Sequence, residues 1–121
     1  MEIKDTYRVD IVVQDCDTAL AHKSGGLSVY ATPAMIALME NAAFTLLKND
    51  GNDSVGTEMN VKHTRACLVG AKVYAQAEVV SVNGNWVNFN VSAFDEKGEI
   101  GSGVHTRYII DSEKFMAKLN K

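Results

Sequence analysis

The segment 33–49 predicts one long helix with apolar side chains on nearly every side. Pro33, the only proline in the chain, suits the first helical position, where its missing N–H is not needed. Thr32 before it is a favoured N-cap, and the Asn- and Asp-rich run 49–53 ends the helix. Such a helix needs other apolar elements on most of its sides. Its apolar residues are Met35, Ile36, Leu38, Met39, Ala42, Ala43, Phe44, Leu46 and Leu47.

Most of the remaining sequence alternates polar and apolar residues and predicts β-strands. The Asn-Gly pair at 83–84 is a strong hairpin signal between two of these strands, and the next turn is expected at 96–98. The segment 14–30, which contains two adjacent glycines, is expected to form a loop or lid. The segment 112–119 predicts a short closing helix. The expected strands are 7–13, 54–65, 71–82, 86–95 and 99–110.

The order of these elements is one strand, one long helix and then four strands joined by tight turns. This order is typical of an α+β domain with a mostly antiparallel sheet. A five-stranded sheet wrapped around a long central helix is the hot-dog fold, and we expect one such domain over residues 1–121. Because an open sheet leaves strand edges exposed, two copies are expected to pair as a homodimer.

Charge and composition exclude several classes of protein. A formal net charge of -3 leaves no basic surface for nucleic acid. No apolar run reaches the roughly 18 residues that a membrane helix needs, and residues 1–5 do not resemble a signal peptide. Cys16 and Cys67 match no C-x-x-C motif, so we expect free thiols in a reducing cytoplasm. The three histidines lack metal-ligand spacing, and neither a metal nor another cofactor is expected.

Glu40 is the residue that the predicted helix explains least. It lies among Leu38, Met39 and Ala42, where a carboxylate without a partner would be costly to bury. One interpretation is that Glu40 has a functional role. The alternative is that it lies on a narrow polar stripe with the other polar residues of the helix.

The strand 54–65 carries two further candidates. Alternation places His63 on the apolar face with Met59 and Val61, pointing toward the helix, and places Gly56 on the opposite face. His63 is either a functional imidazole or a core histidine hydrogen-bonded to the backbone. Gly56 either lets a ligand approach the backbone closely or only marks a bulge.

Thr32 lies at the helix N-terminus, where partial positive charge and free N–H groups suit a carbonyl or oxyanion. Thr32 and Glu40 are eight residues apart, so both can lie on one side of the helix. With His63 and Gly56 they bring a hydroxyl, a carboxylate, an imidazole and a backbone N–H to one helix–sheet interface. This set fits acyl transfer to water.

The motifs that follow one another along the chain are Ala31-Thr32-Pro33, Leu38-Met39-Glu40-Asn41-Ala42-Ala43, Ser54-Val55-Gly56-Thr57, Val61-Lys62-His63-Thr64-Arg65-Ala66, Val69-Gly70 and Gly103-Val104-His105-Thr106-Arg107. From about residue 7 to its end, the chain resembles hot-dog acyl-CoA thioesterases, most of all the fluoroacetyl-CoA thioesterase branch. The resemblance implies hydrolysis of a small or short acyl-CoA to the free acid and CoA. It also implies a site at the interface of a homodimer.

The resemblance implies a role for each candidate residue. Thr32, Glu40 and His63 match the catalytic threonine, glutamate and histidine of that branch, with glutamate either attacking directly or activating water. Gly56 matches a glycine whose N–H holds the thioester carbonyl. His105 and Arg107 also match the family, in its H-x-R strand, and we expect both to contribute only packing on the sheet surface or at an interface.

The lid segment 23–28 departs from the fluoroacetyl-specific pattern, because it lacks that enzyme's aromatic residues. We therefore expect a more general acyl-CoA thioesterase. Two other functions remain as alternatives: a non-catalytic protein that binds acyl-CoA or another small ligand on the same fold, and a hot-dog dehydratase. The usual aspartate and histidine placement of the dehydratase is not seen in the helix. Cys16 and Cys67 are weak candidates for a nucleophile, because neither is paired with a histidine.

Overall fold

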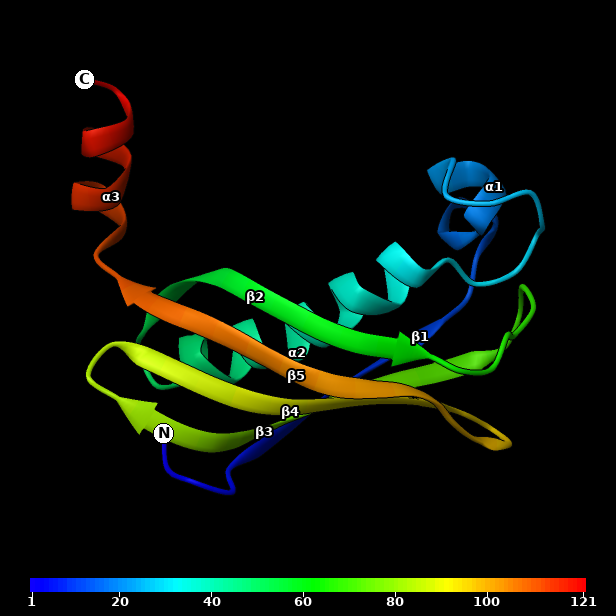
Figure 1. The fold of residues 1–121 in the computed structure, drawn as a ribbon, viewed down its shortest axis with the longest axis horizontal. Helices are drawn as coiled ribbons and strands as arrows, with labels where there is room; N and C mark the ends of the chain where they lie inside the picture. Colours follow the sequence, from blue (N-terminus) through cyan, green and yellow to red (C-terminus); the bar gives the residue numbers. More distant parts are fainter.

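The structure, a computed structural model, describes residues 1–121 and consists of a curved sheet wrapped around one long helix (Figure 1). This arrangement confirms the predicted α+β hot-dog fold. The helices are η1 (Asp15–Asp17), α1 (Ala19–His22), α2 (Thr32–Asn49) and α3 (Ser112–Leu119). The strands are β1 (Thr6–Val12), β2 (Asp53–His63), β3 (Lys72–Asn83), β4 (Trp86–Asp95) and β5 (Gly98–Ile110).

The sheet has the strand order β1-β3-β4-β5-β2, and every neighbouring pair is antiparallel. The turns that join β3 to β4 and β4 to β5 contain Gly84 and Gly98, which adopt φ angles of 61° and 137°. Only glycine adopts such angles readily, so these two residues permit the tight connections. β1 and β2 form the two edges of the sheet, and each therefore has one side of its backbone unpaired.

The core lies between α2 and the concave face of the sheet. Met35, Met39 and Leu47 of the helix are fully buried, and each contributes about 1.5–3 kcal/mol through burial. The helix has apolar cover on most of its sides, as the sequence predicted. One stripe faces outward, and on it Phe44 keeps 38% of its surface exposed. The sheet does not enclose this stripe, which is left for solvent or a second chain.

β2 contains a bulge beside Gly56, which is one of the two interpretations that the sequence left open for this glycine. The register with β5 shifts between Gly56 and Glu58, so Thr57 is the additional residue. A bulge reverses the alternation on one side of it. Gly56 therefore lies on the inner face with Ser54, opposite Arg107, and not on the outer face as simple alternation predicted.

The segment between β1 and α2 forms the expected lid with short helical turns. A bridge from Val29 to Leu68 attaches it to the body of the domain, and a bridge from Thr18 to Tyr30 joins two parts of the segment itself. The segment therefore covers the N-terminal end of α2, as Figure 1 shows for α1.

Candidate active site

Thr32 and His63 are in direct contact at the N-terminal end of α2. The Thr32 hydroxyl oxygen lies 2.9 Å from Nδ1 of His63, in a hydrogen bond between the helix and the end of β2. The predicted N-cap role of Thr32 is wrong. The N-cap is Ala31, which has no side-chain cap, because the Thr32 hydroxyl bonds to His63 and not to the helix backbone.

The His63 imidazole is suited to accept a proton. Burial lowers its pKa below the usual value, because the charged form loses solvation, and the backbone of Arg65 only partly offsets this. Its second nitrogen, Nε2, is buried and has no hydrogen-bond partner. A neutral imidazole with one unpartnered nitrogen can hydrogen-bond to a water molecule or to a substrate atom.

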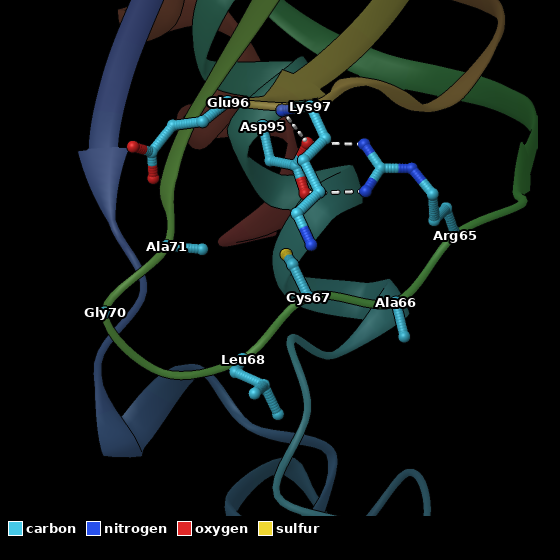
Figure 2. A pocket seen from close by; sticks show the side chains of 9 residues that line it. All are labelled: Arg65, Ala66, Cys67, Leu68, Gly70, Ala71, Asp95, Glu96 and Lys97. Atoms are coloured by element: carbon cyan, nitrogen blue, oxygen red, sulfur yellow. Dashed lines mark hydrogen bonds and ion pairs between the residues drawn. The ribbon is translucent and has the colours of Figure 1, made fainter.

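A pocket of about 230 Å³ lies beside this pair. Thr32 and His63 line it, together with lid residues that include Ser24 and Tyr30. The pocket meets a second one of about 430 Å³, because Arg65 lines both. Figure 2 shows this second pocket, in which Arg65 forms a two-point ion pair with Asp95 of β4. The pair fixes the guanidinium at the junction of the two pockets.

Glu40 lies elsewhere, against the bulged part of β2. Its Oε2 atom is 2.9 Å from the point where a Cβ atom on Gly56 would stand. Arg107 Nη1 is 3.3 Å from the same point, and so is His105 Cε1. Any side chain at position 56 would displace the carboxylate, so glycine is required for this approach.

His105 and Arg107 form a buried polar network beneath Glu40. They are 1% and 6% exposed. Arg107 Nε donates to the Ser54 hydroxyl at 2.8 Å, and its Nη2 donates to the Ser54 carbonyl at 3.1 Å. His105 Nδ1 donates to the Glu58 carbonyl at 2.7 Å, which leaves Nε2 to accept from Arg107 Nη1 at 3.2 Å. These contacts fix His105 as a neutral imidazole with its proton on Nδ1.

The network contains a buried cation whose nearest counter-charge is Glu40. Burial lowers the pKa of the Arg107 guanidinium, and the Glu40 carboxylate acts in the opposite direction. The expectation that His105 and Arg107 pack on the sheet surface or at an interface is therefore wrong, since both are buried beneath Glu40. The signal available in the sequence was that two neighbouring ionisable residues share one face of the strand with Gly101 and Gly103.

Within one chain, the four candidate residues form two separate pairs. Thr32 contacts His63, while Glu40 contacts Gly56. Eight residues of helix separate the Cα atoms of Thr32 and Glu40 by about 12 Å. Seven residues of strand separate Gly56 from His63 by roughly 20 Å. No hydrogen bond joins the two pairs, so one chain does not bring the Glu40 carboxylate onto the His63 imidazole.

Two further observations concern possible ligands and surroundings. The structure contains no group of three or more His, Cys, Asp or Glu side chains placed to hold a metal ion. None of its helices combines the length and apolar character needed to cross a membrane.

The chain is similar to known thioesterases. The family model described as fluoroacetyl-CoA-specific thioesterase matches residues 13–113. The fluoroacetyl-CoA thioesterase of Streptantibioticus cattleyicolor is 42% identical over 96 residues, covering 77% of this chain and 69% of that protein.

Solved structures give the same result. A fluoroacetyl-CoA thioesterase structure superposes with a TM-score of 0.92 at 35% identity, covering 99% of this chain and 96% of that chain. A variant of that enzyme in complex with acetyl-CoA also has a TM-score of 0.92, at 34% identity, covering 99% and 97%. A thioesterase superfamily member from Thermus thermophilus has a TM-score of 0.89 at 25% identity, covering 98% and 90%. By its sequence and its fold, this chain belongs to the fluoroacetyl-CoA-specific thioesterase family.

Proposed function

We propose that the protein hydrolyses a small acyl-CoA thioester to the free acid and CoA, and that it acts as a homodimer in the cytoplasm. Family membership and the acetyl-CoA complex of a relative support this substrate class. The observation that carries the proposal is the Thr32–His63 pair, a hydroxyl on an unprotonated imidazole beside a pocket. The free thiols of Cys16 and Cys67 support a reducing compartment.

Each candidate residue has a role in the proposed reaction. The N-terminus of α2 and the Thr32 hydroxyl polarise the thioester carbonyl, assisted by the N–H of Gly56. Glu40 attacks the carbonyl carbon directly or activates a water molecule that attacks it. In the first route the carbon–sulfur bond breaks as the Glu40 oxygen bonds to the acyl carbon, and water then hydrolyses the resulting anhydride to the free acid. In the second route water itself forms the carbon–oxygen bond as the carbon–sulfur bond breaks. In both routes the neutral His63 takes a proton from the water molecule and passes it to the CoA thiolate.

A homodimer would join the two pairs of residues. The outer edge of β2 is unpaired, and residues 56–58 on it are exposed. Antiparallel pairing of two β2 strands, with a two-fold axis between Met59 and Asn60, would place Gly56 of each copy opposite His63 of the other. Glu40 of one copy would then face the Thr32–His63 pair of the second copy. The dimer would contain two complete sites.

The first test is hydrolysis itself. Purified protein is incubated with acetyl-, propionyl- and butyryl-CoA, and mass spectrometry follows the thioester and free CoA. We expect turnover by the wild type and a loss of about 10²-fold in kcat for His63→Ala, since a positioned proton carrier contributes at least that factor. His22→Ala, which alters an exposed histidine, is the control. Binding of acyl-CoA that is recovered intact would contradict the proposal and support a non-catalytic binding protein.

The second test asks whether two copies share each site. Glu40→Gln and His63→Ala each lower kcat by about 10²-fold or more alone, but a mixed dimer contains one site with both wild-type residues. Random reassembly of an equal mixture is expected to recover about one quarter of the wild-type activity. The control is each variant reassembled with itself, which is expected to stay at about one hundredth of the wild-type activity or below. A mixture that forms dimers by light scattering but remains inactive would show that both residues must come from the same chain.

A further inference from the structure

We propose that Tyr30 limits the length of the acyl group that the enzyme accepts. Its side chain closes the Thr32–His63 pocket against an apolar groove that lies between β1 and α2. This inference rests on the proposed thioester hydrolysis, and it adds a specificity-determining residue to it.

Tyr30 separates two cavities. It lines the 230 Å³ pocket that holds Thr32 and His63, and it also lines a groove of about 530 Å³ on the other side of the helix N-terminus. No other residue lines both. Removing this one ring would therefore connect the pocket with the groove.

The ring is held firmly in place. Only 2% of the Tyr30 surface is exposed, and its backbone N–H donates to the Cys67 carbonyl at 2.9 Å. The ring packs edge-on against the His63 ring, with their centroids 6.4 Å apart. Its hydroxyl makes no hydrogen bond within the chain, and burial raises the pKa of the phenol, so it remains neutral. Packing rather than hydrogen bonding therefore holds the Tyr30 ring between the two cavities.

The groove beyond the ring is suited to an alkyl chain. Ile11 and Val12 of β1 form one apolar side, and Ala34, Ala37 and Leu38 of α2 form the other. The remaining lining residues beside Tyr30 are Gln14, Cys16, Asp17 and Asn41. Small alanines opposite branched side chains leave an apolar channel along the helix. In the wild type this channel is closed to the substrate, so methylene groups beyond a short acyl chain find no apolar surface to bury against.

The experiment compares chain-length profiles. Values of kcat/KM are measured for acetyl-, butyryl-, hexanoyl- and octanoyl-CoA with the wild type and Tyr30→Ala. We expect Tyr30→Ala to raise the octanoyl-to-acetyl ratio of kcat/KM at least about tenfold, because the groove becomes available to the longer chain. Tyr30→Phe keeps the ring and is expected to retain the wild-type length preference.

A second variant tests the groove itself. Ala37 lies on the exposed side of the groove, so a tryptophan there fills it without entering the core. Ala37→Trp alone is expected to leave the profile unchanged, whereas Ala37→Trp added to Tyr30→Ala removes the gain on octanoyl-CoA. If Tyr30→Ala accepted octanoyl-CoA only because the lid had become more mobile, filling the groove with Ala37→Trp would not remove the gain.

The outcomes separate this inference from the proposed function. If the wild type hydrolyses none of the esters, the proposed function fails. The limit on acyl length is then tested by measuring the Kd of the same esters by calorimetry. If Tyr30→Ala hydrolyses acetyl-CoA but gains nothing on longer chains, the inference is overturned. If circular dichroism shows that Tyr30→Ala is unfolded, Tyr30→Leu takes its place with the same expected shift.

Discussion

Replacing Glu40 by glutamine is expected to lower kcat for acyl-CoA hydrolysis by at least about a thousandfold while the protein remains folded. The amide has nearly the same shape as the carboxylate, so packing against Gly56 is preserved. It can neither attack a thioester carbonyl nor remove a proton from water. Steady-state kinetics with acetyl-CoA, together with a thermal unfolding curve, would separate loss of chemistry from loss of structure.

Glu58→Gln is the matched control for this prediction. Glu58 lies two residues from Gly56 on the same strand, but its side chain is exposed and reaches only the Thr106 hydroxyl, at 3.5 Å. We expect its activity to remain within about twofold of the wild type, because a surface substitution of this kind has little effect. If Glu40→Gln also retained activity within tenfold, Glu40 would serve only as the counter-charge of Arg107, and the proposed chemistry would be wrong.

The elements of the fold were predictable because their periodicity is strong. The helix and all five strands begin and end within two residues of the expected positions. The glycine at position 56 left a bulge open as an alternative, but the local pattern did not identify Thr57 as the additional residue, because that requires knowing the partner strand. The same limit applies to Phe44, whose exposure depends on how far the sheet curves around the helix.

The candidate site was predictable in part. The alternation of polar and apolar residues correctly predicted that His63 points inward. The predicted start of the helix correctly placed Thr32 at the helix–sheet interface near His63. The buried role of Arg107 could not be inferred, because it depends on Ser54, a residue more than fifty positions away in the sequence that only strand pairing brings close. The sequence also could not show that the Thr32–His63 pair lies far from the Glu40–Gly56 pair. Residue spacing gives distances along a helix or along a strand, but not how the helix is placed on the sheet.

Arg107→Met is expected to cost about 3 kcal/mol of unfolding free energy and to lower kcat by roughly 10²-fold. The substitution keeps apolar volume but removes the donors to Ser54 and to His105 Nε2, and it leaves the Glu40 carboxylate without its nearest cation. Urea unfolding measures the first effect, and kinetics with acetyl-CoA measures the second. Arg8→Met is the control, because Arg8 forms an exposed pair with Asp10 that contributes at most about 1 kcal/mol.

A double-mutant cycle distinguishes charge pairing from simple packing at Arg107. If the guanidinium stabilises the Glu40 carboxylate, Arg107→Met costs less in a Glu40→Gln background than in the wild type, by about 1–2 kcal/mol. If Arg107 only fills space and bonds to Ser54, the two costs are equal. Arg107→Lys adds a third measurement: it keeps the charge without the planar set of donors, so it should recover part of kcat while Ser54 remains incompletely bonded. Arg107 would have only a packing role if Arg107→Met cost the same in both backgrounds and Arg107→Lys recovered none of kcat. Glu40 would then rely on Gly56 and the helix alone for its position.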